Sequence, residues 1–463
     1  METLRTSSYL IDVKLDNSDK YMLIHGYTGA IDIVNEKVAL SLKNTPEIFL
    51  KEDAPFSEET IEALQKRGYL TEKTQEEEYA YVARMANLLH KKEFLTERHY
   101  VWVVTYDCNF RCPYCFEHEL TKTDKPWSNK AFSHSMVDNA YASIVQMERN
   151  HPDGGINKTM ILYGGEPLLA KNLEIVEHIV KKGNELGFKF KAVTNGYELD
   201  AYKELLNPNQ ISALQITIDG IKSCHDTRRK HFLHKSTFDK ILKNIELALL
   251  QKVRVVVRIN TDKIVFDQLE ELYDKFKEFH FFDFEAFSIE SALLREHNMV
   301  TSLKNNIQYM TMREYLSKHE SVGYKYGCQF QSIYKDILNV INGKSRLRFR
   351  STYCSSQCNG YIFDPYGNIY PCWDTIGNAQ FIIGSYDKCS IELNSKSILW
   401  RNHDISYGNK CRYCRYAFLC GGGCLAKATQ LENNFVNSDC NSFPIIMRTA
   451  VNRAFNEYKA HIV

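Results

Sequence analysis

The stretch TYDCNFRCPYCFE at residues 105–117 decides how the rest of the chain is interpreted. It places Cys108, Cys112 and Cys115 with C-x3-C-x2-C spacing directly after the apolar, β-prone run YVWVVTY at 100–106. Three thiolates are one short of a closed tetrahedral site, so a metal or cluster bound here keeps one position open for a ligand. Open positions are where metal centres do chemistry. The spacing alone fits a structural zinc site with a distant fourth ligand equally well.

The cysteine triplet, with an aromatic residue at Tyr114, resembles the signature of the radical S-adenosylmethionine (radical SAM) enzymes. In that family the amino and carboxylate groups of the methionine moiety chelate the open iron of a 4Fe–4S cluster. Three later segments fit the resemblance in order. They are GGEP at 164–167 after TMILY, TNG at 194–196 after FKFKAV, and QITIDG at 215–220 with His225, Asp226 and Arg229 after it.

The resemblance implies roles for these residues. The three cysteines bind the catalytic cluster, and glycine lets the GGEP backbone approach the ligand without a side-chain clash. Hydroxyl and cationic donors suit the methionine carboxylate. The residues implied to contact S-adenosylmethionine are Tyr114, Gly164, Gly165, Glu166, Pro167, Thr194, Asn195, Thr217, Arg229 and Arg258. The ordinary alternative for each polar residue is a strand-end cap or a surface ion pair.

A second cysteine array lies near the C-terminus and includes the run CRYCRYAFLCGGGC at 411–424. It resembles the SPASM extension of radical SAM peptide-modifying enzymes, in which eight cysteines hold two auxiliary 4Fe–4S clusters. The resemblance implies that one cluster takes Cys354, Cys358, Cys372 and Cys424, and the other takes Cys411, Cys414, Cys420 and Cys440. The alternative is a pair of structural zinc knuckles. Without Cys358 as a ligand, the first of these clusters would keep an open iron, and Cys328 is a further thiol of interest.

Cysteine use and composition bound the remaining possibilities. Of 14 cysteines, Cys224, Cys328 and Cys389 are left over and are expected to be ordinary buried thiols. Many free thiols without a signal peptide predict a reducing cytoplasm. A formal net charge of +1 gives no basic field for nucleic acid, and no apolar run approaches the roughly 18 residues that span a bilayer. We therefore expect a cytoplasmic protein without nucleic-acid or membrane partners.

The centre of the chain, residues 98–290, predicts an α/β fold. Six apolar runs alternate with helical patterns, which indicates a parallel sheet, and they lie at 100–106, 159–163, 188–193, 211–218, 253–259 and 280–287. The resemblance implies that this sheet closes into a partial (β/α)6 radical SAM barrel. The motifs then lie at the carboxyl ends of successive strands, where barrel folds place their chemistry. Residues 291–350 read as a helical bridge and residues 351–463 as the SPASM domain.

The N-terminal piece, residues 1–90 with a helical linker to 97, has a different pattern. The runs YLIDVKL, KYMLIHG and AIDIV predict three strands, and SEETIEALQKRG predicts a helix capped by Ser57 that ends near Gly68. This order resembles the winged-helix RiPP recognition element, a domain that binds the leader of a ribosomally made precursor peptide as an added strand. A winged helix can also bind DNA, but this helix is too acidic to suit a phosphate backbone.

Together these resemblances imply a maturase that uses three 4Fe–4S clusters, S-adenosylmethionine, a precursor peptide bound through its leader, and a flavodoxin- or ferredoxin-type electron donor. Auxiliary clusters suit the removal of an electron, which favours an oxidative cross-link. A thioether from a peptide cysteine, of sactipeptide or ranthipeptide type, is the first choice. The alternatives are carbon–carbon or carbon–oxygen cross-linking, epimerisation, anaerobic sulfatase maturation, and a non-catalytic iron–sulfur or zinc redox sensor. In sulfatase-maturing enzymes an aspartate follows the equivalent of Cys372, whereas here Trp373 follows it and Asp374 is displaced by one.

Overall fold

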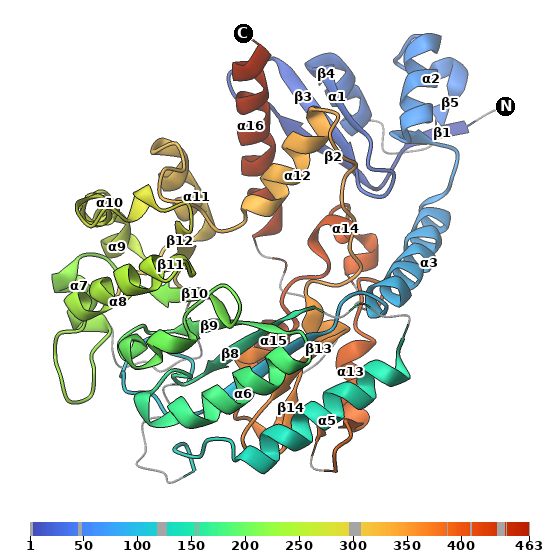
Figure 1. Cartoon of the computed structure of the whole chain (residues 1–463). Coiled ribbons are helices and arrows are strands. Elements are labelled where there is room, and N and C mark those ends of the chain that lie inside the picture. Colours follow the sequence, from blue (N-terminus) through green and yellow to red (C-terminus); the bar gives the residue numbers. More distant parts are fainter. Residues whose placement is uncertain are drawn as a thin grey trace. The chain divides into compact units, whose positions relative to one another are not determined.

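The contacts within the chain divide it into two units (Figure 1). The computed structural model describes residues 3–44, 49–117, 127–152, 155, 157–295, 307–386, 388–407, 410–432, 440 and 442–462. Unit 1 comprises Met1–Leu95, Phe330–Cys358 and Leu399–Val463, and unit 2 comprises Thr96–Gln329 and Asn359–Ile398. The segment after residue 351, taken from the sequence as one domain, is thus shared between the two units.

Unit 2 is built on six parallel strands. They are β7 (His99–Thr105), β8 (Thr159–Gly164), β9 (Lys189–Thr194), β10 (Ile211–Thr217), β11 (Arg254–Thr261) and β12 (Phe287–Leu293). Their spatial order β7-β8-β9-β10-β11-β12 follows the chain, and every neighbouring pair is parallel. This confirms the predicted alternation of strands and helices, because parallel neighbours need a crossover between them.

The sixth strand begins later than the sequence indicated. The aromatic run at 280–287 was expected to be the strand, but Phe281–Asp283 forms a short 3-10 turn and β12 starts only at Phe287. Phe281 is fully buried and packs against Phe276 at 6.0 Å and Phe287 at 5.2 Å between ring centroids. The run therefore closes the end of a helix and fills the core, which an apolar pattern alone does not distinguish from a buried strand.

Helices connect the strands of unit 2. They are α5 (His134–Asn150), α6 (Leu173–Glu185), α7 (Lys222–Arg228), α8 (Phe238–Leu250), α9 (Lys263–Asp267) and α10 (Leu269–Glu278), with α11 (Met312–Ser321) after the last strand. Their apolar faces join one core with the strands, in which Trp102 donates to the sulfur of Met160 at 3.2 Å. Sheet and helices together fix the carboxyl ends of the strands, where the sequence motifs lie.

Part of the cysteine-rich tail extends the same sheet. Strand β13 (Gly360–Phe363) pairs in parallel with β7, and β14 (Asn368–Tyr370), β15 (Gly384–Ser385) and β16 (Glu392–Leu393) continue it antiparallel. Tyr106 donates to Asp364 at 3.0 Å, which joins this extension to the segment before the cysteine triplet.

Unit 1 contains the predicted three-stranded antiparallel sheet. It consists of β2 (Leu10–Lys14), β3 (Lys20–His25) and β4 (Ile31–Asn35), followed by α1 (Glu36–Asn44). Helix α2 (Glu58–Arg67) starts at the predicted cap, where Ser57 accepts from the amide of Thr60, and ends at Gly68 with φ 88°. A second small sheet, β5 (Phe49–Leu50), β1 (Thr3–Thr6) and β6 (Leu70–Thr71), was not predicted.

Helix α3 (Gln75–Phe94) is held to the N-terminal strands by a buried carboxylate. Glu78 accepts from Arg5 at 2.5 Å, from the hydroxyl of Ser7 at 2.6 Å and from the amide of Ser8 at 2.9 Å. A charge can be buried when such donors surround it. The segment expected to be a helical linker is therefore an integral part of the N-terminal fold.

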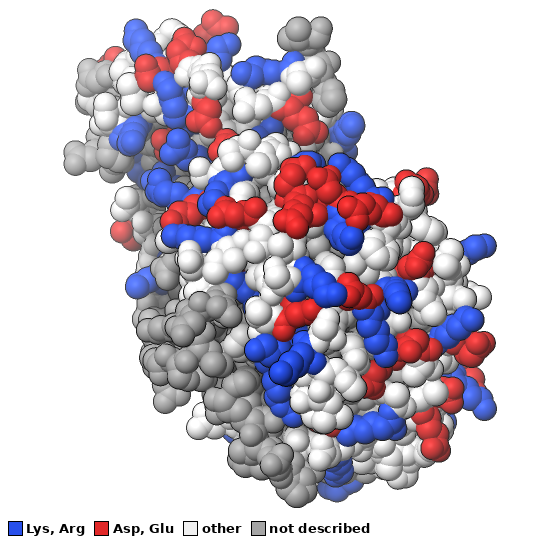
Figure 2. Space-filling model, turned by 90° about the vertical axis from the view of Figure 1, so that its left-hand side faces the viewer, with Lys and Arg blue, Asp and Glu red and all other residues white. Residues whose placement is uncertain are grey.

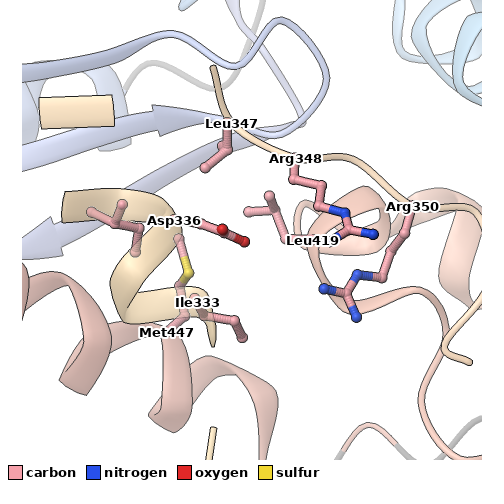
Figure 3. A pocket seen from close by; sticks show the side chains of 8 residues that line it. Ile333, Asp336, Leu347, Arg348, Arg350, Leu419 and Met447 are labelled. Carbon is pink, nitrogen blue, oxygen red and sulfur yellow. The ribbon is translucent and has the colours of Figure 1, made fainter. Parts of the chain in front are cut away.

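The remaining helices of unit 1 come from the second half of the chain. Helix α12 (Gln331–Ile341) packs with α16 (Phe443–Ile462), and short helices α14 (Ala417–Cys420) and α15 (Leu425–Glu432) lie in the cysteine-rich segment, while α13 (Ser395–Arg401) crosses the boundary between the units. A small cavity of about 10 Å³ beside α12 has room for one water molecule and lies among Ile333, Asp336, Leu347, Arg348, Arg350, Leu419 and Met447 (Figure 3).

Surface charge is mixed. Figure 2 shows basic and acidic side chains interspersed over one face, as expected for a chain with 58 basic and 57 acidic residues. Across the described part of the chain, every helix is too short or too polar to cross a bilayer.

Candidate functional site

The cysteine triplet lies in the loop after β7. Cys112 is buried and Cys108 and Cys115 are half-buried, and the amide of Phe110 donates to the sulfur of Cys108 at 3.3 Å. Burial is the main cause that raises the pKa of each thiol. The neighbouring Cys112 raises the pKa values of Cys108 and Cys115 further. The three thiols therefore lie near one another in a setting where a bound cation makes the thiolate form favourable.

The distances between the sulfur atoms of these thiols differ between a site for a single metal ion and a site for a cluster. Within the described ranges, no three His, Cys, Asp or Glu side chains converge as they would on a single metal ion. A zinc ion draws its sulfur ligands to about 2.3 Å. In a 4Fe–4S cluster each thiolate binds a different iron atom, so the sulfur atoms lie further apart. The donor type, the burial and the N–H···S contact fit a cluster.

The GGEP turn packs against the start of the cysteine loop. The amide of Gly165 donates to Thr105 O at 3.0 Å, and the amide of Glu166 donates to Asp107 O at 2.8 Å. A Cβ atom on Gly165 would lie 2.4 Å from Asp107 O, and Gly164 has φ 125°. Both glycines are therefore required for this close approach of two backbone segments.

The carboxylate of Glu166 joins the GGEP and TNG motifs. One oxygen accepts from the Thr194 hydroxyl at 2.6 Å and from the amide of Leu168 at 2.9 Å, and the other accepts from the amide of Asn195 at 2.6 Å. Burial raises the pKa of Glu166 to about 7. The side chain thus fixes the turn from inside the protein, and Pro167 is buried beside it.

Asn195 continues this network to the cysteine loop. Its side-chain amide donates to Asn109 Oδ1 at 2.7 Å, and its Oδ1 accepts from the amide of Tyr197 at 2.9 Å. Asn109 in turn donates to Glu198 at 2.9 Å. The TNG motif therefore holds the segment between Cys108 and Cys112 in place.

A second polar group forms around Tyr114. Its hydroxyl donates to Asp219 and accepts from Arg229 Nη1 at 2.9 Å, and the amide of Asn260 donates to Asp219 at 3.3 Å. The Arg229 guanidinium lies over the Phe110 ring, 5.6 Å from its centroid. These contacts bring residues from the ends of β7, β10 and β11 to one place.

Two buried nitrogens in this region are left without hydrogen-bond partners in the described structure. They are Nε of Arg229 and Nε2 of His225. Burial lowers the pKa of His225 to about 3, so its ring is neutral, and its Nδ1 accepts from the amide of Asp219 at 3.2 Å. The ring therefore carries its proton on Nε2. Each of these nitrogens is a buried donor available to a bound polar group.

Thr217 and Arg258 are adjacent in register on β10 and β11. Thr217 is buried at the carboxyl end of β10. Arg258 donates to Asn260 Oδ1 at 3.2 Å and forms an ion pair with Glu290 at 3.7 Å. Among the described contacts, the Arg258 side chain reaches the residues around Tyr114 through Asn260, whereas Arg229 contacts Tyr114 directly.

The structure also reveals residues that motif matching did not select. Glu117, two residues after Cys115, is buried, and among the described residues its Oε1 has no hydrogen-bond partner. Burial raises its pKa to about 8. Nearby, the rings of Tyr163 and Trp373 lie 5.1 Å apart. From the sequence, only the position of Glu117 beside the cysteine triplet could have indicated a role for it. No sequence pattern predicted the contact between Tyr163 and Trp373.

Most of the second cysteine array lies in unit 1. The pKa of Cys420 is raised to about 12, first by burial and then by Cys411 and Cys414, while the amides of Gly422 and Gly423 donate to its sulfur. Burial raises the pKa of Cys414, and Cys440 raises it further. The four cysteines implied to share one auxiliary cluster are thus neighbours. Of the other set, Cys354, Cys358 and Cys424 belong to unit 1 and Cys372 to unit 2.

The three leftover cysteines differ from one another. Cys224 and Cys328 are buried as expected. Cys389 is exposed, with φ 58°, so the expectation of burial was wrong for this residue. It lies in the turn between β15 and β16, which the sequence did not indicate as part of a sheet.

Comparison with known proteins agrees with this geometry. Residues 102–276 match the family model of the radical SAM superfamily. These residues are similar in sequence to radical SAM domains. The residues that the sequence implied for the first site, from Cys108 to Arg258, all lie within this matched range. The matched range ends before the second cysteine array.

Individual relatives match different lengths of the chain. The cysteine-type anaerobic sulfatase-maturating enzyme of Clostridium perfringens (strain 13 / Type A) is 25% identical over 375 residues, which cover 75% of this chain and 95% of the relative. The GTP 3',8-cyclase of Campylobacter fetus subsp. fetus (strain 82-40) is 29% identical over 159 residues, 34% of this chain and 44% of that relative. The solved structure of "Native anSMEcpe with bound AdoMet and Cp18Cys peptide" has a TM-score of 0.57 at 18% identity, covering 79% of this chain and 99% of that one.

Proposed function

We propose that this protein is a radical SAM maturase that installs an oxidative cross-link, a thioether from cysteine, in a ribosomally made precursor peptide. The observation that carries the proposal is the joining of four motifs at one end of a parallel sheet. Glu166 connects the GGEP and TNG motifs, Asn195 connects them to the cysteine loop, and Tyr114 connects that loop to Asp219 and Arg229. A simple redox sensor needs no such group around its cluster.

The residues of the first site have distinct tasks. Cys108, Cys112 and Cys115 hold the catalytic 4Fe–4S cluster. The carbonyl oxygens of the GGEP backbone offer acceptors for the amino group of S-adenosylmethionine, and Thr217, Arg229 and His225 offer donors. When bound, the cluster and S-adenosylmethionine supply a 5′-deoxyadenosyl radical that removes a hydrogen atom from a peptide carbon. The protein's contribution is position: Glu166 and Asn195 hold the loops, and burial excludes water from the reacting atoms.

The second cysteine array supports an oxidative outcome. We assign Cys411, Cys414, Cys420 and Cys440 to one auxiliary cluster, and Cys354, Cys358, Cys372 and Cys424 to the other. The amides of Gly422 and Gly423 stabilise the thiolate of Cys420. Forming a thioether from a C–H and an S–H bond removes two hydrogen atoms. The 5′-deoxyadenosyl radical removes one of them. The other leaves as a proton and one electron, and auxiliary clusters are suited to accept that electron.

The N-terminal sheet supports a leader-binding role. Strand β4 lies at the end of its sheet in the described residues. The amide of His25 donates to Ala30 O, and hydrogen-bonded and non-hydrogen-bonded pairs alternate from there along β3 and β4. Leu23 and Asp32 are therefore a hydrogen-bonded pair. The backbone N–H and C=O groups of Ile31 and Ile33 point away from β3. A peptide strand can add to such an edge. Arg67 donates to Ile31 O at 3.0 Å, which leaves Ile33 as the centre of the open edge.

Sulfatase maturation is the second candidate. It is favoured by the relative from Clostridium perfringens, which matches 75% of this chain. Trp373 in place of an aspartate after Cys372, and the added N-terminal sheet, favour a peptide cross-link instead. The two functions differ in their products. Cross-linking of a precursor removes two hydrogens while the cysteine sulfur is retained in a thioether, whereas cysteine-type sulfatase maturation converts a cysteine to an aldehyde.

The test is anaerobic incubation of the reduced, iron-reconstituted protein with S-adenosylmethionine and a cysteine-containing precursor peptide. We expect a loss of two hydrogens per cross-link, no free thiol at the modified cysteine, and no product with Cys112→Ala. A sulfatase-derived cysteine peptide is the matched substrate. Conversion of that peptide to an aldehyde, with the precursor unchanged, would reject cross-linking and establish the second candidate. A colourless protein holding only zinc would reject both.

A further inference from the structure

The segment Lys230–Lys235 lies directly on the loop that carries the cysteine triplet. The amide of Arg111 donates to Lys230 O and the amide of Phe232 donates to Asn109 O, both at 2.9 Å. Between these bonds Phe110 and His231 form an antiparallel bridge. The segment is thus a short strand-like cover on the residues between Cys108 and Cys112.

The tip of this cover presents apolar side chains to solvent. Phe232 is 57% exposed and Leu233 is 69% exposed. The tip is nevertheless ordered, because buried His231 accepts at Nδ1 from the amides of Leu233 and His234, each at 3.1 Å. The protein therefore holds two large apolar groups in water at a defined place. An exposed apolar pair of this kind in a basic rim is typical of a contact surface.

The surroundings of the tip are basic. Lys230, His234 and Lys235 are exposed, and the Arg111 guanidinium lies over the Phe232 ring, 5.7 Å from its centroid. In the described structure none of Arg111, Lys230 and Lys235 forms an ion pair. Among the neighbouring carboxylates, Asp107 pairs with Lys171 and Asp200 pairs with Lys240. Glu198 and Asp226 accept hydrogen bonds from neutral groups, which do not balance a carboxylate charge.

We propose that Arg111, Lys230, Phe232, Leu233, His234 and Lys235, here called the carrier face, dock a small acidic one-electron carrier protein of the flavodoxin or ferredoxin class. This inference rests on the proposed function, because the reductive cleavage of S-adenosylmethionine consumes one electron, which a carrier protein would deliver to the catalytic cluster. The carrier is oxidised by one electron and the catalytic cluster is reduced by one, and no bond is made or broken. The Phe232–Asn109 hydrogen bond leads to the residue next to Cys108, so docking here brings the carrier close to the cluster.

Physical reasons favour a carrier over other partners. Electron-transfer complexes are small and transient, and a patch of six residues around two apolar side chains matches that scale. An unpaired basic rim attracts an acidic partner and speeds its association, and salt weakens this attraction. The net charge of the whole chain is only +1, so this steering depends on the local patch.

The test reverses charge at the rim without touching the cysteine loop. We compare Lys230→Glu/Lys235→Glu with the matched control Lys189→Glu/Lys252→Glu, which makes the same charge change at the amino ends of β9 and β11. A third variant, Leu233→Ser, removes the most exposed apolar group. The first readout is binding of oxidised flavodoxin to each protein by calorimetry at 50 and 300 mM NaCl, values on either side of physiological ionic strength.

The second readout separates docking from chemistry. The rate of 5′-deoxyadenosine formation is measured with flavodoxin reduced by its reductase, and again with dithionite. For the rim variant we expect at least about tenfold weaker binding and slower flavodoxin-driven turnover at low salt, with the dithionite rate within about twofold of wild type. Leu233→Ser weakens binding at both salt concentrations. The control variant behaves as wild type.

Three outcomes would overturn the proposal. The rim variant binds flavodoxin and is reduced by it as well as wild type. Alternatively, the rate of 5′-deoxyadenosine formation in the rim variant falls by the same factor with both reductants, which would show that Lys230–Lys235 only supports the cysteine loop. Finally, affinity for the precursor peptide falls while reduction by flavodoxin is unchanged, which makes the face a peptide site. A wild-type protein that forms no 5′-deoxyadenosine even with dithionite would instead reject the proposed function.

Discussion

The hydroxyl of Thr194 donates to Oε1 of Glu166 at 2.6 Å, and through this bond two motifs that are 28 residues apart act as one structure. Thr194 ends β9 and Glu166 follows β8, so the bond spans neighbouring strands at the edge where the cysteine loop begins. The buried carboxylate accepts three hydrogen bonds in all. This arrangement makes Glu166 an organiser of the turn and gives the first prediction.

Glu166→Gln should weaken S-adenosylmethionine binding about 10- to 100-fold, because one acceptor becomes an amide donor that faces Thr194 or the Asn195 amide. Loss of a charge-assisted bond costs about 1.5–3 kcal/mol. Iron content should not change, since the cysteines keep their positions. Equilibrium dialysis with labelled S-adenosylmethionine measures the affinity. Thr194→Ser retains the hydroxyl and serves as the control. An unchanged affinity in Glu166→Gln would show that the turn keeps its shape without the carboxylate.

Tyr114→Phe should reduce S-adenosylmethionine affinity about tenfold with full cluster loading. The substitution keeps the ring but removes the hydroxyl that accepts from Arg229 and donates to Asp219, so two buried charged groups lose a shared partner. Binding and iron content are measured on the same preparation. Arg258→Lys is the comparison, because among the described contacts the Arg258 side chain reaches these residues through Asn260. Equal losses in both variants would contradict the distinction between the two arginines.

Cys420→Ala should lower the iron content by about four atoms per chain, as expected for loss of one 4Fe–4S cluster. Cys112→Ala should do the same and also abolish 5′-deoxyadenosine formation. Cys389→Ala is the control, because that thiol is exposed and lies outside both cysteine arrays. Iron and sulfide analysis after anaerobic reconstitution provides the count. Wild-type-like iron in Cys420→Ala would remove this residue from the ligand set.

Ile33→Pro should weaken binding of the precursor leader at least about tenfold and leave turnover of a leaderless core peptide unchanged. Proline removes only an outward-pointing N–H and suits an edge strand, so the β3–β4 pairing survives. Ile33→Ala retains the N–H and is the matched control. Fluorescence anisotropy of a labelled leader measures the affinity. A leader that binds Ile33→Pro as tightly as wild type does not use this edge.

Acidification should destabilise the N-terminal sheet through His25. Burial lowers the pKa of His25 to about 4, while the unfolded value is 6.5. The folded ring is neutral, so the full stability is present above pH 6.5 and declines as the pH falls from 6.5 to about 4, by about 3 kcal/mol. His25 contacts the Ser7 hydroxyl at 3.0 Å and accepts from the Thr28 amide at 3.2 Å, which glutamine can reproduce.

Hydrogen exchange in β3, corrected for the intrinsic effect of pH, measures this stability in the full chain. His25→Gln should flatten the dependence between pH 4 and 6.5, and His280→Gln, at an exposed histidine, should leave it as in wild type. A slope that persists in His25→Gln would assign the pH dependence to another group.

The sequence by itself determined the parts of this protein that depend on local order. The covalent chain fixes the spacing of cysteines in a short loop, so the pattern of Cys108, Cys112 and Cys115 could be recognised before the fold was known. Period and capping are also local, and they predicted five of the six parallel strands within two residues, the cap of α2 at Ser57 and its end near Gly68. The sixth strand was displaced because Phe281 could fill a core in either a strand or a turn.

Only the tertiary structure decided which side chains converge. Glu166 could have faced a ligand or the interior, and the neighbouring strand end placed Thr194 and Asn195 where they bind it. Asp219 was selected by its contact with Tyr114, 105 residues away, and Arg229 by the same hydroxyl. The tail was divided because β13 pairs with β7, and Lys230–Lys235 is joined to the cysteine loop by backbone hydrogen bonds with Asn109 and Arg111. Long-range hydrogen bonds of this kind depend on the packing of whole elements, and no local pattern encodes them.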